Sequence, residues 1–162
     1  MILIDGYESE SLPASDRGLQ FGDGCFTTAL ILEGRICRHE AHLQRLKEGC
    51  ERLAIPFTAW SVLAQEMDDR AATLQRGVLK VVITRGSGGR GYSSNGCLQP
   101  RRIVSVAGYP AQYDQWRKTG ITLLTSPVRL GINPALAGIK HLNRLEQVMI
   151  RQFIDQIGRA HV

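Results

Sequence analysis

Residues 78–84 read VLKVVIT, and this stretch decides the fold class of the chain. β-branched residues fill five of its seven positions, which favours a strand. The segment that follows, RGSGGRGYSSNG at 85–96, contains too much glycine for a regular helix or strand. Residues 101–107 then resume the pattern of a strand. The sequence therefore predicts two strands joined by a long glycine-rich loop.

Three further strands are predicted on the N-terminal side of this pair. Residues 1–4 are apolar and end at the turn Asp5-Gly6. Residues 26–32 are a second candidate, and residues 35–37 return after the turn at Glu33-Gly34.

Helices are predicted on both sides of VLKVVIT. One spans about 40–54, ahead of Pro56, because apolar residues recur at intervals of three and four: Leu43, Leu46, Cys50 and Leu53. A second spans about 59–74. After a further strand at 121–125, an apolar stripe predicts a last helix that stops at Gly158: Leu142, Leu145, Val148, Met149 and Ile154. We expect an uncovered stripe of this width to promote association of chains.

The order of these elements indicates an α+β fold rather than strictly alternating strands and helices. The segment YPAQYDQWRKTG at 109–120 is polar and rich in turn residues, which is typical of a boundary. We therefore predict a small α+β domain over 1–112 and the start of a second domain over 113–162.

Composition indicates a globular protein, with 43% apolar and 22% charged residues. The net charge of +5 and the isoelectric point of about 9.3 suit an anionic partner. The basic residues occur singly rather than in runs, so a small anionic metabolite is favoured over nucleic acid, which remains a weaker alternative.

Cellular context is indicated by two negative features. Cys25, Cys37, Cys50 and Cys97 form no CxxC pair and match no zinc spacing, so we expect buried free thiols and no metal. The first residues lack a signal peptide and no stretch suits a membrane span, so we expect a cytoplasmic protein.

Several residues are candidates for chemistry. Lys140 lies between an apolar approach and an amphipathic helix, and a lysine amine becomes nucleophilic when burial or nearby cations lower its pKa. From local features alone, a surface lysine at a helix start is the more common interpretation. Arg85, Arg90 and Tyr92 in the glycine-rich loop suit a carboxylate. His39 and His42 lack a third metal ligand, so capping or packing is favoured.

Four motifs together carry a resemblance that none carries alone: DRGLQFGDGCFTT at 16–28, HLQRL at 42–46, VVITRGSGGRGY at 81–92 and GIKHLNRLEQ at 138–147. Their order and spacing resemble the fold-type IV pyridoxal 5'-phosphate (PLP) enzymes. The forms TRGSGGRGY and SPVRLGINPALAGIKHLNRLEQ are similar to the 4-amino-4-deoxychorismate lyases within that group. The resemblance implies a small domain with an antiparallel sheet and two helices, followed by the beginning of a larger domain.

The resemblance also implies roles for individual residues. Lys140 matches the catalytic lysine that holds PLP, and Arg45 matches the arginine that contacts the cofactor phosphate. Arg90 and Tyr92 match loop positions that meet the substrate carboxylate, with Arg85 suited to the same task. Phe26 and Thr28 match positions that line the pocket; the D-amino-acid enzymes carry tyrosine at the position of Phe26.

The implied activity is conversion of 4-amino-4-deoxychorismate to 4-aminobenzoate and pyruvate in folate biosynthesis, by a homodimer. The family's second domain supplies an acidic partner for the pyridine nitrogen and further phosphate contacts, whereas this chain ends 22 residues after Lys140 with GRAHV. Activity of these 162 residues alone is therefore not expected. The alternatives left open are a branched-chain or D-amino-acid aminotransferase and a non-catalytic fragment.

Overall fold

The computed structural model describes residues 2–157, which form two compact units. One unit comprises 2–109 together with 138–142, and the other comprises 110–137 with 143–157. The short return of 138–142 to the first unit is the feature that positions the candidate site. The predicted domain division after residue 112 stays a prediction.

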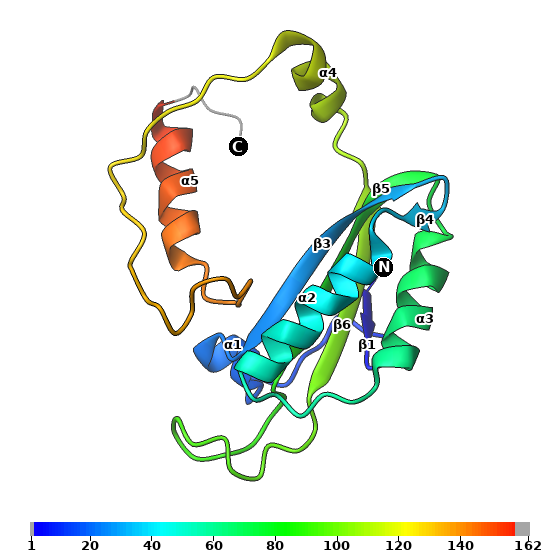
Figure 1. Cartoon of the computed structure of the whole chain (residues 1–162), viewed down its shortest axis with the longest axis vertical. Coiled ribbons are helices and arrows are strands. Elements are labelled where there is room, and N and C mark those ends of the chain that lie inside the picture. The colour runs from blue at the N-terminus through cyan, green and yellow to red at the C-terminus, as the bar shows by residue number, and fades with distance from the viewer. Residues whose placement is uncertain (1, 158–162) are drawn as a thin grey trace. The chain divides into compact units, whose positions relative to one another are not determined.

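A six-stranded antiparallel sheet forms the first unit, in the order β2-β1-β6-β5-β3-β4 (Figure 1). The strands are β1 (Ile2–Ile4), β2 (Tyr7–Glu8), β3 (Gly24–Leu32), β4 (Arg35–Ile36), β5 (Arg76–Thr84) and β6 (Arg101–Gly108). The predicted strands up to residue 107 are confirmed, with small shifts at their ends. β2 is a two-residue strand that the sequence analysis missed.

β5 lies at the centre of the sheet because both of its edges are paired. All nine of its residues pair with residues of β3, from Gly24↔Thr84 to Leu32↔Arg76. Its other edge pairs with β6, from Gly77↔Gly108 to Thr84↔Arg101. The stretch VLKVVIT thus satisfies its backbone hydrogen bonds on both sides.

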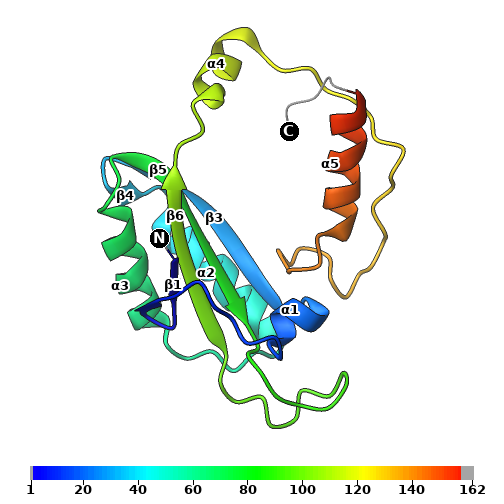
Figure 2. The same cartoon turned by 180° about the vertical axis from the view of Figure 1, so that it is seen from behind.

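Two helices, α2 (His39–Arg52) and α3 (Trp60–Ala71), cover the same face of the sheet (Figures 1 and 2). The side chains between helices and sheet make a core that is fully shielded from solvent at its centre: Ile31, Leu46, Leu63, Met67, Leu79, Val81, Ile83 and Val104. Side chains alternate along a strand, so Phe26, Thr28 and Lys80 project from the opposite face. The predicted fold class, an antiparallel sheet with two helices, is confirmed.

A short helix, α1 (Arg17–Phe21), was not predicted. The side chain of Asp16 caps its start by accepting a hydrogen bond of 2.8 Å from the backbone N–H of Gly18. Gly22 ends the helix in the left-handed conformation, with φ of 66°. Both signals are present in DRGLQFG.

In the second unit, one helix was missed and one predicted strand was wrong. The polar segment at 109–120 contains a helix, α4 (Gln112–Thr119), with Asp114 in its first turn and Arg117 and Lys118 in its last. That charge order suits a helix dipole and was overlooked. Residues 121–125 form no strand, and all five are exposed. No strand in the described part of the chain pairs with them, so their backbone groups have no ladder to join.

The last helix, α5, spans Leu145–Ile157. Leu145, Val148 and Met149 of the predicted stripe are exposed, whereas Ile154 is buried. Leu142 lies outside the helix, and the predicted stop at Gly158 falls outside the described residues. Between residues 2 and 157, no helix has the length and apolar character that crossing a membrane would require.

Candidate active site

Residues 138–142 run along the free edge of β3 and bring Lys140 to the sheet. The backbone N–H of Phe26 donates to the carbonyl of Lys140 at 2.9 Å, and that of Leu142 donates to the carbonyl of Gly24 at 3.0 Å. An antiparallel bridge joins Cys25 and His141 between them. β4 pairs only with the far end of β3, at Ile31 and Leu32, so this edge is available.

Gly24 makes this approach feasible. A Cβ atom there would contact the carbonyl oxygen of Ile83 and would lie 2.7 Å from Cδ1 of Leu142. The second glycine of the FGDG motif therefore leaves room for the segment that carries Lys140. The close approach at Gly24 is thus to a neighbouring segment of the chain.

The side chain of Lys140 is half-buried beside the ring of Phe26. Its Nζ atom lies 4.6 Å from the centre of that ring. Nζ of Lys80 lies 5.5 Å from the same ring centre, and Lys80 is the register partner of Thr28. Two amines, an aromatic ring and a threonine thus share one region of the sheet face opposite to α2 and α3, which we call the open face.

Lys80 is a candidate that the sequence analysis did not single out. The alternation of VLKVVIT contained the signal, because Leu79 and Val81 are core residues and the residue between them must face the other way. A lysine there lies on the face opposite to the helices.

Arg45 lies on α2, the helix that covers the opposite face, and its side chain is exposed. Its charge acts on His42, whose pKa is lowered first by burial and then by the positive charges of Arg45, His39 and Arg38. Nδ1 of His42 and Oγ1 of Thr27 share a hydrogen bond of 2.7 Å, which confirms the packing role favoured for this histidine. This part of α2 is electropositive and suits an anion, but the assignment of Arg45 to the cofactor phosphate stays a prediction.

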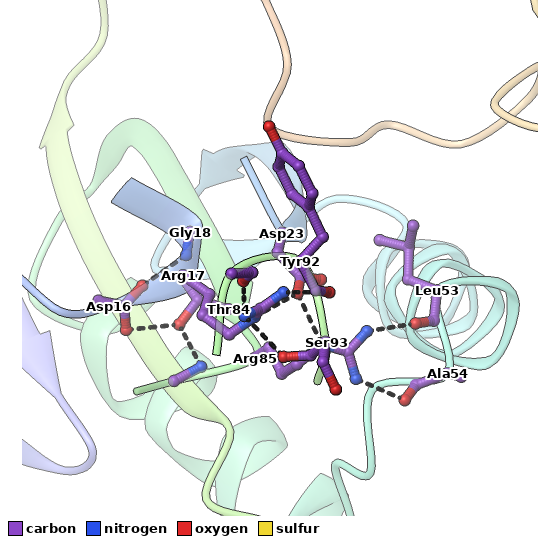
Figure 3. A network of polar contacts seen from close by, with 12 residues as sticks. Asp16, Arg17, Gly18, Asp23, Leu53, Ala54, Thr84, Arg85, Tyr92 and Ser93 are labelled. Atoms are coloured by element: carbon purple, nitrogen blue, oxygen red, sulfur yellow. Dashed lines mark hydrogen bonds and ion pairs between the residues drawn. The ribbon is translucent and has the colours of Figure 1, made fainter. Parts of the chain in front are cut away.

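The glycine-rich loop between β5 and β6 is tied to α1 by Arg17, whose side chain is only 4% exposed (Figure 3). Nε of Arg17 donates to Oδ2 of Asp23 at 3.0 Å. The two terminal nitrogens donate to the carbonyls of Gly91, Tyr92 and Ser93 at 3.0–3.1 Å. One guanidinium therefore holds three consecutive residues of the loop.

Arg85 sits at the base of the same loop and shares Asp23, donating from Nε at 2.7 Å (Figure 3). Its other nitrogens donate to the carbonyls of Ala54, at 2.8 Å, and Leu53, at 2.6 Å. Arg85 thus connects the loop to the end of α2. Its predicted contact with a substrate carboxylate is not tested by these bonds, although they occupy donors on all three nitrogens.

Arg90 and Tyr92 are exposed at the tip of the loop. The ring of Tyr92 meets that of Phe21 edge to face, with ring centres 5.5 Å apart. The structure thus gathers Lys140, Phe26 and Thr28 with Lys80 on the open face, and Arg90 and Tyr92 on the loop. Their predicted roles stay predictions.

The four cysteines are free, and Cys25, Cys50 and Cys97 are buried as expected, whereas Cys37 is half-buried. Sγ of Cys25 lies 3.9 Å from Sγ of Cys50. The contact with Cys25, together with burial, raises the pKa of the Cys50 thiol, which stays protonated. This pair packs β3 against α2, on the face of the sheet opposite to Phe26.

Comparison with known proteins agrees with this arrangement. Residues 24–159 match the family model described as amino-transferase class IV. The chain belongs to the class IV aminotransferase family. The matched region includes β3, the glycine-rich loop and Lys140.

Within this family, the chain is similar to proteins named as lyases. It is 37% identical over 155 residues to an aminodeoxychorismate lyase of Vibrio harveyi, covering 96% of this chain and 57% of the relative. It superposes on the crystal structure of 4-amino-4-deoxychorismate lyase from Pseudomonas aeruginosa with a TM-score of 0.87 and 43% identity, covering 94% of this chain and 56% of that one.

Another similar protein is named for two activities. It is a bifunctional aminodeoxychorismate lyase and D-amino acid transaminase of Mycobacterium tuberculosis, 31% identical over 119 residues, which are 70% of this chain and 39% of the relative. The chain thus spans about half the length of the curated relatives it matches.

Proposed function

We propose that this chain carries the lysine and the substrate loop of a PLP-dependent lyase that converts 4-amino-4-deoxychorismate to 4-aminobenzoate and pyruvate, a step of folate biosynthesis in the cytoplasm. The observation that carries the proposal is the backbone pairing of 138–142 with β3, which holds Lys140 beside Phe26. The names of the Vibrio harveyi and Pseudomonas aeruginosa relatives support the choice of reaction.

The residues present fit the cofactor. PLP needs a primary amine for its aldehyde, and Lys140 offers one that is half-buried and held by its own backbone. The phosphate needs positive charge, and Arg45 belongs to the electropositive part of α2. Phe26 offers an aromatic surface, and we assign Phe26 and Thr28 to the lining of the pocket.

The chemistry then divides between the cofactor and the chain. When bound, PLP supplies an electron sink for the charge left by proton removal. Lys140 removes the proton from the carbon that bears the substrate nitrogen and returns a proton to the departing pyruvate. Arg90 and Tyr92 bind substrate carboxylate, and Lys80 adds positive charge near Lys140. Arg85 already donates to Asp23, Leu53 and Ala54, so we give the direct contact to Arg90.

Borohydride trapping tests the assignment of the lysine. The chain is incubated with PLP, reduced and digested, and mass spectrometry locates the added pyridoxyl group. We expect the group on Lys140, and its loss in Lys140→Ala but not in Lys118→Ala, an exposed lysine of α4. A reduced adduct on another lysine would show that Lys140 is the wrong residue.

Turnover is measured after joining the chain to the part of the Vibrio harveyi lyase that its match leaves uncovered. We expect pyruvate release in the wild type and a loss on the order of 10²–10⁴-fold or more in Lys140→Ala. A transaminase is the second candidate, because the Mycobacterium tuberculosis relative carries both activities in its name. Amino-group exchange between an amino donor and a keto acid, without pyruvate release from the aminochorismate, would favour it.

Association is tested separately. We propose a homodimer, and light scattering over a concentration series measures its mass. The exposed Leu145, Val148 and Met149 of α5 are the apolar surface that we expected to promote association.

A further inference from the structure

The tip of the glycine-rich loop takes its shape from a side chain outside the loop. The carbonyls of Gly91, Tyr92 and Ser93 all accept hydrogen bonds from the guanidinium of Arg17 (Figure 3). Within the loop, Ser93 N–H donates to the carbonyl of Arg90 at 3.2 Å. Arg17 of α1 therefore fixes the backbone on both sides of Tyr92. Arg90 immediately precedes Gly91, so it adjoins the fixed segment.

Arg17 is itself held in place from several directions. The N-cap contact of Asp16 sets the start of α1, and the backbone N–H of Arg17 donates to the carbonyl of Gly86 at 2.9 Å. Asp23 pairs with Nε, and the ring of Phe21 lies 4.9 Å from the guanidinium carbon. Phe21 also contacts the ring of Tyr92. These contacts thus hold the guanidinium in one position, unlike a mobile charge on the surface.

We infer that Arg17 is a positioning residue that sets the placement of Arg90 and Tyr92 and thereby the affinity for the carboxylates of the substrate. The inference rests on the proposed function, which assigns those two residues to the substrate. Arginine is required because its planar group offers five N–H donors, and three carbonyls and one carboxylate are arranged around it. A lysine keeps the charge for Asp23 but cannot reach the same four acceptors.

The experiment uses the 162-residue chain and compares wild type with Arg17→Lys. Trypsin cleavage after the exposed Arg90 reports the order of the loop, and cleavage at Arg117 and Lys118 in α4 gives an internal reference. Equilibrium dialysis measures binding of 4-amino-4-deoxychorismate to the PLP-treated chain, and borohydride trapping measures the adduct at Lys140. In Arg17→Lys we expect faster cleavage after Arg90 and about tenfold to a hundredfold weaker substrate binding, with an unchanged adduct yield.

Two further variants separate positioning from a general loss of structure. Gly89→Ala disturbs the loop without removing Arg17, because Gly89 has φ of 75° and an added Cβ would meet the carbonyl oxygen of Ser93. We expect it to weaken substrate binding as Arg17→Lys does. Ser15→Ala removes an exposed hydrogen bond of 3.0 Å to Ser87 at the base of the same loop, and we expect wild-type cleavage and binding.

The outcomes are distinguishable. Cleavage of Arg17→Lys at the wild-type rate would overturn the inference, as would a loosened loop with unchanged substrate binding. Equal loss of substrate binding and of the Lys140 adduct would also overturn it, because it would indicate a damaged fold. A wild-type chain with neither adduct nor substrate binding would overturn the proposed function and, with it, the substrate role of Arg17, while the cleavage rates would still report the loop.

Discussion

Two of the stretches predicted as strands, 78–84 and 121–125, have similar composition, and only the first forms a strand. VLKVVIT at 78–84 lies in β5 between β3 and β6 and hydrogen-bonds to both. ITLLT at 121–125 is also apolar and β-branched, but all five of its residues are exposed and it forms no strand. The exposed fraction of Leu79 is 0%, and that of Leu123 is 81%. The difference lies in the neighbours and not in the stretch itself.

The contrast extends to the loops. Residues 85–96 contain no regular structure, yet Arg17 and Arg85 tie them to α1 and α2 through buried side chains. The apolar residues of 121–132 are less buried: Val128 is half-buried, and Ile121, Leu123, Leu124, Leu130 and Ile132 are all exposed. Order in this chain therefore follows from buried polar anchors and paired edges more closely than from apolar content.

Among the substitutions that test this contrast, the largest loss of stability is expected at Asp23. Asp23→Asn removes the charge shared by Arg17 and Arg85, whose side chains are 4% and 9% exposed, and leaves two guanidinium groups without their counterion. Breaking a buried pair in this way typically costs about 3–5 kcal/mol. We expect a loss of that order in the free energy of unfolding of the chain, measured in urea.

A matched control comes from the second unit. Asp155→Asn breaks the ion pair of Arg151 and Asp155, 2.7 Å apart and about half exposed. Exposed pairs of this kind contribute about 0–1 kcal/mol, so we expect a change near zero. Similar losses in both variants would contradict the distinction between anchored and exposed regions.

The next largest effect on stability is expected when leucine is replaced by alanine in each of the two apolar stretches. Leu79→Ala empties a fully buried position in β5, where such changes cost about 2–5 kcal/mol. Leu123→Ala removes the same atoms from an exposed position, where the change is usually within about 0.5 kcal/mol. Urea unfolding of both variants tests the comparison. A substantial loss in Leu123→Ala would show that ITLLT is packed and would contradict the contrast between the two stretches.

Sequence reasoning predicted the first unit well because local patterns and tertiary contacts agree there. Alternation in β3 and β5 and the period of α2 each place the same residues in one core. It failed at 121–125 because a strand depends on a partner that the stretch itself does not encode. It missed α1 and α4 although their caps and charge order were readable, because both helices are short and α4 has no buried residue to mark an apolar face.

The candidate site was predicted only in part, for a similar reason. Lys140 and the loop residues came from motif resemblance, whereas Lys80 and Arg17 depend on contacts between distant segments. The register Thr28↔Lys80 and the bonds from Arg17 to 91–93 join residues more than 50 positions apart. No local pattern in the sequence specifies such contacts, although strand alternation did indicate the face on which Lys80 lies.

The smallest expected effect on stability concerns His42, a half-buried histidine of the first unit whose pKa depends on its surroundings. Burial, then Arg45, His39 and Arg38, lower its pKa below the ordinary 6.5, which favours the neutral ring in the folded chain. The unfolded chain takes up the proton first as the pH falls. The stability contributed by the neutral ring is therefore complete above about pH 6.5 and is lost as the pH falls toward the lowered pKa of the folded state.

Arg45→Gln tests this assignment because it removes the first of the positive charges that act on His42. We expect the pKa of His42, followed by its ring signals in an NMR titration, to rise toward its ordinary value, and the loss of stability on acidification to become smaller. Lys47→Gln is the matched control, since it removes a charge from the same helix that is not among those lowering the pKa of His42. Inorganic phosphate bound near Arg45 should raise the pKa of His42 in the wild type and not in Arg45→Gln. An unchanged titration of His42 in Arg45→Gln would show that burial alone sets its pKa and that Arg45 contributes no local field for an anion.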